Sequence, residues 1–348
     1  MRSKTRCGTE TAVDLFAGCG GLSLGLRKAG FHVLGAIELC ELAVETYKMN
    51  HPEPLVYHND IQDVSALGFK RQLGLRKGEL DLLAGCPPCQ GFSTVRTLNG
   101  SRRVQDPRND LLFEFLRFVE AFAPRAVMLE NVPGLLSNYR MKRFLSRLRG
   151  LGYYVNSDIL DASDYGVPQR RRRLIILASV NAAIGFPSAA RKPRTVRDAI
   201  GSLKPVGESG DPLHDLPEER SPRVRSLIRS IPKDGGSRKD AAHRFQLACH
   251  KKCNGFKDVY GRMAWDEAAP TITGGCVNPS KGRFLHPEED RCITLREAAL
   301  LQTFPKRYRF SLRRGKFPAA EMIGNALPPE FVRRQALAVL KHLDSEAH

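Results

Sequence analysis

The most reactive side chains of this sequence are two cysteines that stand close together. Cys86 and Cys89 lie in the run GCPPCQGFS, which starts at residue 85. Their C-x-x-C spacing suggests disulfide redox chemistry as one alternative. In such redox sites the second cysteine lies in the helix that the motif opens, whereas here two prolines separate the thiols and Gly91 follows directly. We therefore favour a reactive Cys89 beside a structural Cys86, and a Cys89 thiolate could act as a nucleophile.

A glycine-rich turn near the N-terminus could bring backbone amides close to a ligand. The turn, FAGCGG from residue 16, lies between an apolar run and helix-compatible residues. Glu38 ends the next apolar run, where a carboxylate can accept hydrogen bonds from ribose hydroxyls. Asp60, beyond a third run, is a similar acceptor, although an isolated Asp there is usually a helix N-cap. The glycines do not match the strict dinucleotide fingerprint, so a tight turn without a ligand stays open beside a nucleoside-bearing cofactor.

Alternating apolar runs and helical stretches must position these residues. The runs expected to form strands are 11–16, 31–37, 54–57, 80–84, 126–129, 153–160 and 174–178. Helical spacing occupies 22–29, 41–49, 110–122 and 135–148, and recurs at 295–301 and 330–343. Strands that alternate with helices in this way indicate a wound α/β sheet. Ligands of open α/β sheets bind at the carboxyl ends of the strands, where Glu38 and Asp60 are expected.

The composition changes after residue 185. Residues 190–260 are rich in Pro, Gly, Ser, Arg and Lys and contain 16 basic and 9 acidic residues. Scattered apolar residues favour a small loop-rich domain over a disordered linker. The whole chain has 55 Lys and Arg against 37 Asp and Glu, a formal net charge of +18. Such an excess attracts polyanions such as nucleic acid, although charge alone leaves open a merely soluble basic protein.

Several classes of protein are disfavoured. No run of eighteen apolar residues and no apolar signal-peptide core occur among the 348 residues, so we expect a cytoplasmic protein that does not span a membrane. The nine cysteines are then expected to be reduced. A cluster of potential zinc ligands lacks a second pair at finger distance, so we expect packing and polar contacts there and no metal. The cluster consists of His243, Cys249, His250 and Cys253.

Six short motifs stand in the order found in the DNA (cytosine-5) methyltransferases. They are DLFAGCGGLS (14–23), PCQ (88–90), ENV (130–132), QRRRR (169–173), REAALLQTFP (296–305) and GNALPP (324–329). The chain resembles this family from residue 12 to about 345, apart from roughly 190–260. The resemblance implies an α/β, Rossmann-like S-adenosylmethionine-dependent methyltransferase sheet with a smaller loop-rich target-recognition domain. It places the catalytic and cofactor-binding domain at 10–185, target recognition at 186–292, and a C-terminal segment with a returning helix at 293–348.

The resemblance also implies a mechanism. A target cytosine is flipped out of duplex DNA, Cys89 adds to its C6, and methyl passes from S-adenosylmethionine to C5. Glu130 would donate or share a proton at N3. Arg171 and Arg173 would act beside the base, with Arg173 at the O2 edge, while Arg170 and Arg172 belong to a solvated or phosphate-facing turn. The base that removes the C5 proton is not assigned to a side chain.

Further residues are carried over in the same way. Phe16 would pack near the cofactor adenine, and Asn325 near its methionine end once the C-terminal helix folds back. The expected cofactor site is completed by Gly18, Gly20, Glu38 and Asp60. Gln90 and Ser93 are expected to contact the opened duplex. The segment PTITGG (270–275) would belong to the recognition region, although no single base-reading residue can be chosen.

Two rivals remain beside duplex-DNA methylation. One is the same chemistry on RNA, and the other is a DNA-binding relative without activity. The basic segment favours DNA, and Cys89, Glu130 and Arg173 favour an enzyme. A short N-terminus and a compact recognition segment favour a monomeric, stand-alone enzyme of restriction-modification type. A cognate restriction endonuclease that acts separately is left open, and the target sequence cannot be predicted.

Overall fold

The chain folds into two compact units. A computed structural model describes residues 9–88, 110–242, 245 and 258–345. Unit 1 comprises Met1–Asp161, Arg172–Ala189 and Pro329–His348, and unit 2 comprises Ala162–Arg171 and Ala190–Pro328. Each unit is therefore assembled from segments that are far apart in the sequence.

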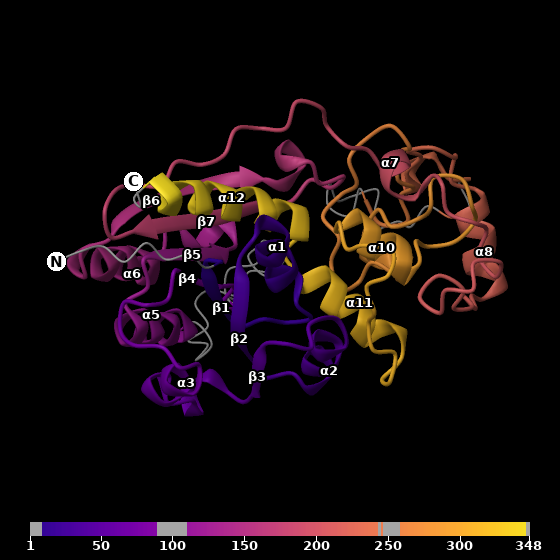
Figure 1. Ribbon diagram of the computed structural model, residues 1–348. Helices are drawn as coiled ribbons and strands as arrows, with labels where there is room; N and C mark the ends of the chain where they lie inside the picture. Colours follow the sequence, from indigo (N-terminus) through magenta and orange to yellow (C-terminus); the bar gives the residue numbers. More distant parts are fainter. Residues whose placement is uncertain (1–8, 89–109, 243–244, 246–257, 346–348) are drawn as a thin grey trace. The chain divides into compact units, whose positions relative to one another are not determined.

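Unit 1 is built on a seven-stranded sheet with the strand order β3-β2-β1-β4-β5-β7-β6 (Figure 1). The strands are β1 (Thr11–Leu15), β2 (His32–Glu38), β3 (Leu55–His58), β4 (Leu82–Gly85), β5 (Ala126–Asn131), β6 (Tyr154–Asp161) and β7 (Arg172–Ser179). The first five are parallel, whereas β7 runs antiparallel to both β5 and β6. The wound α/β sheet expected from the alternating pattern is confirmed, with each strand at or near its predicted place.

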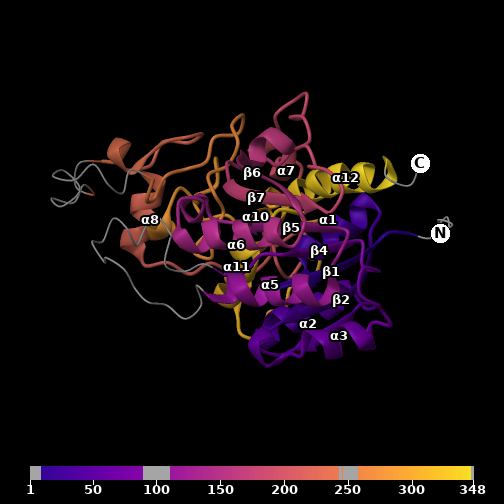
Figure 2. The ribbon, with the colours of Figure 1, turned by 90° about the vertical axis from the view of Figure 1, so that its left-hand side faces the viewer.

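One face of the sheet carries the largest apolar cluster of unit 1. Alternate residues of a strand point to opposite faces, so every second residue of β1, β4, β5 and β7 reaches this cluster. It packs against α3 (Ala66–Gln72), α5 (Leu111–Phe122) and α6 (Tyr139–Gly150), of which α5 and α6 lie toward the viewer in Figure 2. The aromatic members of the cluster are Phe69, Phe115, Phe118, Phe122, Phe144 and Tyr153. The central strands β1, β4 and β5 are buried on both faces, which accounts for the continuous apolar runs of the sequence.

The other residues of β1 and β2 point toward α1 (Gly21–Ala29) and α2 (Glu41–Asn50), and α1 packs against α12 (Pro329–Ser345). The contact between α1 and α12 depends on Gly25. A Cβ atom at this position would lie 2.3 Å from Cβ of Val332 and 2.7 Å from the carbonyl oxygen of Pro329. Gly30 ends α1 with a left-handed φ of 116°, a conformation that favours glycine.

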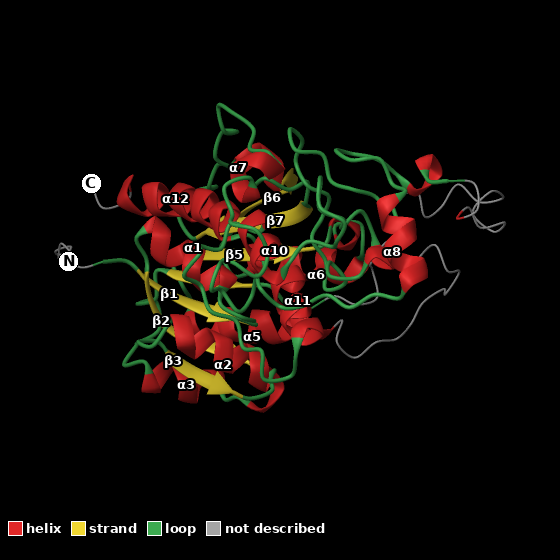
Figure 3. Cartoon of the chain, turned by 90° about the vertical axis from the view of Figure 1, so that its right-hand side faces the viewer, coloured by secondary structure: helices red, strands yellow, loops and turns green. Residues whose placement is uncertain are grey.

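Unit 2 is dominated by loops, which Figure 3 shows between its short helices. The helices among its described residues are α7 (Val196–Ile200), α8 (Pro222–Arg229), α10 (Leu295–Leu301) and α11 (Lys316–Asn325). The 3₁₀ turns in the described parts of both units are Ile61–Asp63, Pro133–Leu135, Ala162–Tyr165, Arg238–Asp240 and Pro279–Lys281. A buried cluster that includes Leu227, Ile228 and Ile231 packs within the described part of the basic segment. Among the described helices of the whole chain, none has the length and apolarity needed to cross a membrane.

The contact at Gly25 gives a stability prediction. We expect Gly25→Ala to lower the free energy of unfolding by about 1–3 kcal/mol, because the added methyl group would overlap backbone and Cβ atoms that cannot rotate away. Gly150→Ala is the matched control, since a Cβ atom there meets nothing within 4 Å. The control should be neutral or slightly stabilising. Equal urea midpoints for the two variants would contradict the close contact between α1 and α12.

Candidate active site

An ion pair joins β5 and β7 at the carboxyl end of β5. Arg173 Nε donates to Glu130 Oε1 across 2.7 Å, and their side chains are only 16% and 12% exposed. The antiparallel register aligns Glu130 with Ile175 and Asn131 with Leu174, so Arg173 stands just past the last pair. Arg173 Nη1 also donates to the carbonyl of Arg172, at 2.8 Å. Two residues 43 positions apart in the sequence are therefore fixed as one charged unit.

Cys86 follows β4 and lies next to this pair. Its thiol is hydrogen-bonded to the Glu130 carboxylate. Burial raises the pKa of the Cys86 thiol well above its usual value, the negative charges of Glu130 and Asp14 raise it further, and Arg173 opposes them. A thiol in these surroundings stays protonated and is a poor nucleophile. The described geometry thus gives Cys86 a structural role, while Cys89, Gln90 and Ser93 lie outside the described residues.

Asn131 fixes the start of the segment that leads to Cys89. Its Nδ2 donates to the carbonyl oxygen of Pro87 across 2.9 Å, and its Oδ1 accepts the backbone N–H of Val132. Asn131 is 4% exposed, so both hydrogen bonds are shielded from water. The sequence places Asn131 in the ENV motif without indicating this contact, because the partner is 44 residues away.

The glycine-rich turn after β1 has the backbone conformation expected of a ligand-binding loop. Gly18 and Gly20 have φ of 55° and 92°, and Phe16 has φ of 62°, which is unusual for a residue with a side chain. The Gly18 N–H donates to Glu38 Oε2 across 2.8 Å. The N-cap residue of α1 is Gly20, which has no side chain to cap the helix. Glu38 therefore stabilises the turn, and a carboxylate still has lone pairs for further donors.

Two other residues predicted to bind the cofactor, Asp60 and Asn325, lie in different settings. Asp60 Oδ1 accepts the backbone N–H of Gln62 across 3.0 Å, which makes it the N-cap of a 3₁₀ turn. Asn325 is exposed and is the last residue of α11 in unit 2. Within the described ranges there is no group of three or more metal-ligating side chains. The histidine and cysteine cluster at 243–253 lies outside those ranges.

Sequence reasoning missed a buried carboxyl group beneath the turn. Asp14 is fully buried, and Ser23 Oγ donates to its Oδ2 across 2.6 Å. The same hydroxyl is 2.7 Å from the Tyr47 hydroxyl, so the three side chains connect β1, α1 and α2. Burial raises the pKa of Asp14 to about 7, and Glu38 adds to the shift while the hydrogen bonds with Ser23 oppose it. An Asp in an apolar run is the only sequence signal of such a site.

Gln169 and Gln302 form the centre of a buried network in unit 2. The backbone N–H of Ile272 donates to Gln169 Oε1, and Gln169 Nε2 donates to Gln302 Oε1, both across 2.7 Å. Gln302 Nε2 in turn donates to the carbonyls of Ile323 and Ala326. Neither glutamine side chain is exposed. Gln169 thereby shares one set of amide hydrogen bonds with segments more than a hundred residues further along the sequence.

Arg171 and Gly324 complete this network. Arg171 is 3% exposed, and its Nη1 donates to the carbonyls of Ile272 and Gly324, each across 3.0 Å. A Cβ atom at Gly324 would lie 2.1 Å from the carbonyl carbon of Thr273 and 2.3 Å from the nitrogen of Gly274. The backbone of 272–274 therefore passes directly over a glycine. The structure describes Arg171 only within unit 2, and its predicted action beside the base stays a prediction.

Comparison with known proteins identifies the family. A model of the family described as C-5 cytosine-specific DNA methylase matches residues 11–341. The chain belongs to this family. It is 36% identical over 348 residues to the Type II methylase M.HgiDII of Herpetosiphon aurantiacus, covering 95% of each chain. It is 32% identical to the Type II methyltransferase M1.HphI of Haemophilus parahaemolyticus, covering 96% of this chain and 88% of that one.

The fold has solved counterparts. A variant of DNMT2 from Spodoptera frugiperda superposes with a TM-score of 0.64 at 16% identity, over 95% of this chain and 100% of that one. The present chain is thus a DNA (cytosine-5)-methyltransferase, as the six motifs predict. Enzymes of this family use S-adenosylmethionine as the methyl donor.

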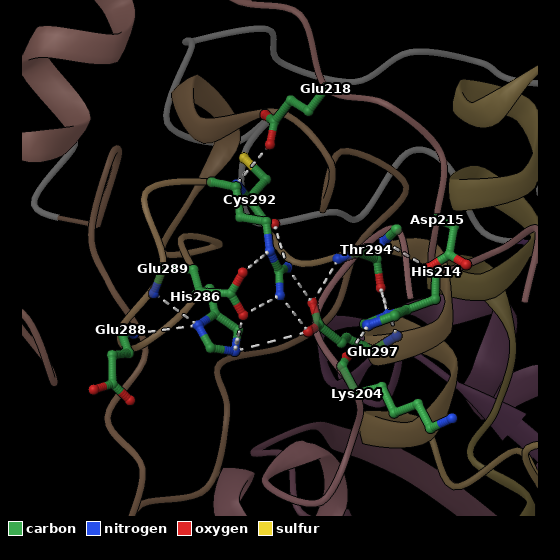
Figure 4. A network of polar contacts seen from close by, with 12 residues as sticks. Lys204, His214, Asp215, Glu218, His286, Glu288, Glu289, Cys292, Thr294 and Glu297 are labelled. Atoms are coloured by element: carbon green, nitrogen blue, oxygen red, sulfur yellow. Dashed lines mark hydrogen bonds and ion pairs between the residues drawn. The ribbon is translucent and has the colours of Figure 1, made fainter. Parts of the chain in front are cut away.

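The motif at 296–305 has a structural role in the methylase. Glu297 accepts two hydrogen bonds from Arg291, at 2.7 and 2.8 Å, and forms a capping box with Thr294 at the start of α10 (Figure 4). Thr294 Oγ1 is also 2.9 Å from His214 Nδ1. Arg296 forms an ion pair with Asp211 and donates to the carbonyl of Tyr308. These contacts explain why the motif carries charges on a helix whose residues are nearly all buried.

The glutamine network predicts that Gln302→Leu destabilises unit 2. The substitution leaves the Gln169 amide and two carbonyls without their partner, and each unsatisfied buried group costs about 1–3 kcal/mol. We expect a loss of at least about 2 kcal/mol in the free energy of unfolding and faster hydrogen exchange at the Ile272 amide. Gln62→Leu, at an exposed position, is the control and should change neither. Unchanged exchange at Ile272 would show that the network does not stabilise this segment.

Asp14 predicts a pH dependence of stability. Below about pH 4 the carboxyl group is protonated in both states, whereas between about pH 4 and pH 7 it ionises only in the unfolded chain. The native methylase should lose up to about 4 kcal/mol of stability across that range, and Asp14→Asn should lack this loss. The stability of the variant minus that of the native chain, from urea unfolding, should therefore rise from pH 4 to pH 7. A difference that stays constant with pH would contradict a carboxyl group that is buried in its neutral form.

Proposed function

We propose that this methylase flips a cytosine out of duplex DNA and uses Cys89 as the nucleophile that activates C5. The observation that carries the proposal is the Glu130–Arg173 ion pair beside the segment that leads from Cys86 to Cys89. The two side chains offer a carboxyl group and a planar donor side by side at the carboxyl end of β5. The N3 and O2 edge of a cytosine requires this combination of groups.

The chemical steps follow from the base. C5 of cytosine is a poor nucleophile until the Cys89 thiolate forms a bond to C6 and the electrons of the C5–C6 double bond shift toward C5 and N3. Glu130 donates or shares a proton at N3, and Arg173 hydrogen-bonds O2, so both groups stabilise the charge that develops on the ring. After C5 has been methylated, a base removes the C5 proton and the electrons left behind expel the Cys89 sulfur.

The residues around the glycine-rich turn fit S-adenosylmethionine. A Cβ atom at Gly18 would meet no atom within 4 Å, so the turn faces open space, and the N-cap residue of α1, Gly20, has no side chain that would fill the space. We assign the adenine to Phe16, the ribose hydroxyls to Glu38 with Asp60 nearby, and the methionine end to Gly18, Gly20 and Asn325. When bound, S-adenosylmethionine supplies an electrophilic methyl group on a sulfonium.

We assign target recognition to unit 2. Its support is the basic, loop-rich composition of the segment and the buried network that fixes 272–274 against α11. A recognition loop gains from such support, because its side chains must meet base edges in one geometry. Type II relatives at 36% and 32% identity support a sequence-specific modification enzyme. Such an enzyme would act as a monomer, independently of any cognate endonuclease.

Duplex DNA that contains 5-fluorocytosine tests the nucleophile. Fluorine at C5 cannot leave as a proton, so the native methylase should form a covalent complex that survives denaturing electrophoresis. Cys89→Ser should form none, while Cys86→Ser, the matched control at the neighbouring protonated thiol, should still trap the DNA.

Two outcomes would contradict the proposal. A covalent complex formed by Cys89→Ser would assign the nucleophile to another residue. Radiolabelled methyl groups that enter transfer RNA but not duplex DNA would replace the DNA substrate with RNA.

A further inference from the structure

Helix α6 carries a large excess of basic side chains. Its twelve residues include five basic side chains and no acidic one. The basic residues are Arg140, Lys142, Arg143, Arg147 and Arg149. The opposite face buries Met141, Phe144, Leu145 and Leu148 in the core of unit 1. The helix therefore presents an almost wholly basic outer face, and Figure 2 shows it beside α5 on the outside of the sheet.

The basic residues near the start of α6 are only partly neutralised. Arg140 pairs with Asp110 at 3.1 Å and stacks on the exposed ring of Tyr139. Arg143 is exposed and lies over the ring of Phe113 at 5.2 Å. Among the described residues, no acidic side chain forms an ion pair with Arg143 or with the exposed Lys142. These two cations are thus available to a partner in solution.

The basic residues at the start of α6 are not needed for folding, and they destabilise the helix. The N-terminus of a helix carries a partial positive charge, so acidic residues stabilise the first turn and basic residues destabilise it. The helices α7 and α10 follow the rule, with Asp198 and Glu297 in their first turns, whereas α8 and α11 have no acidic residue there. Helix α6 has Arg140 and Lys142 in or next to its first turn and no acidic residue there. Charges that cost stability are usually kept for function.

The start of α6 lies at the functional edge of the sheet. The chain passes from Glu130 and Asn131 at the carboxyl end of β5, through the turn Pro133–Leu135, into α6. The helix then returns toward the start of β6, which is parallel to β5 because both are antiparallel to β7. The first turns of α6 are therefore at the same edge as the Glu130–Arg173 pair, and the last turn is at the opposite edge.

We propose that Tyr139, Arg140, Lys142 and Arg143 form a contact surface for the phosphate backbone of the duplex that flanks the flipped cytosine. The inference rests on the proposed function, because a cytosine that reaches Glu130 brings its flanking duplex to this edge. Lys142 and Arg143, which form no ion pair with a described acidic side chain, are complementary in charge to a duplex phosphate backbone. Side chains that contact phosphates contribute affinity and salt dependence but no sequence information. We call these four residues the α6 phosphate surface.

Salt dependence of DNA binding tests the α6 phosphate surface. The variant Lys142→Gln/Arg143→Gln is compared with the native chain on a duplex that the native chain methylates, with dissociation constants from fluorescence anisotropy at several salt concentrations. Each lost phosphate contact should reduce the slope of log K against log salt by about 0.9. Loss of both contacts should reduce it by about 1.8 and weaken binding at 0.1 M salt up to about 60-fold. The maximal rate at saturating DNA should be unchanged.

A matched control separates local contact from total charge. Arg76→Gln/Lys77→Gln removes the same two charges from an exposed loop that precedes β4, at the opposite edge of the sheet. Its slope should equal that of the native chain, and both variants should unfold within about 2 °C of it.

Equal slopes for the two double variants would overturn the α6 phosphate surface. If the native chain methylates no duplex at all, the proposed function fails first and the surface fails with it. A normal native activity with equal slopes would leave the proposed function standing and reject only the surface.

Discussion

The pairing of β5 with β7 is the constraint on which the candidate active site depends. Strand side chains alternate between faces, so a slip of one residue in this antiparallel register would move Arg173 to the other side of the sheet. Glu130 would then stay partly buried without its cation, and an uncompensated charge of this kind is strongly unfavourable. The same register aligns Asn131 with Leu174, and Asn131 fixes Pro87 through its side chain. One strand pairing thus positions the carboxylate, the guanidinium and the start of the cysteine segment.

The arginine motif at 169–173 serves both units of the chain. Gln169 and Arg171 are hydrogen-bonded inside unit 2, to the segment around Ile272 and to the end of α11. Arg173 is the second residue of β7 in unit 1, where it pairs with Glu130. Every second residue of the motif, Gln169, Arg171 and Arg173, thus makes a specific side-chain contact. Arg171 and Arg173 look equivalent in the sequence, yet one satisfies carbonyls in a buried network and the other holds a carboxylate.

Much of the fold could be predicted from the sequence, because it depends on local patterns. Apolar runs located the strands, and the glycine-rich turn located the functional edge of the sheet. The antiparallel place of β7 could not be predicted, since nothing in an apolar run specifies the direction of a strand. The contacts of Asn131, Gln302 and Asp14 could not be predicted from the sequence either, because each depends on which distant residues become neighbours. Cys89 is assigned as the nucleophile from its motif alone, while the structure supplies the reason why Cys86 is a poor nucleophile.

Three departures from local stability rules occur at one edge of the unit 1 sheet. Phe16 has a left-handed backbone conformation, Asp14 is a buried carboxyl group, and α6 begins with basic residues. Such departures persist only where the rest of the fold compensates for them, and the compensation here is the large apolar cluster beneath the strands. At the opposite edge of the sheet, Asp81 is the one described acidic residue at a strand end that is buried, as Asp14 is at the carboxyl edge. That carboxylate is paired with Arg125 at 3.0 Å and also accepts hydrogen bonds from Thr11, so it stabilises the fold. The residues that cost stability therefore lie at the carboxyl edge, where the candidate active site is.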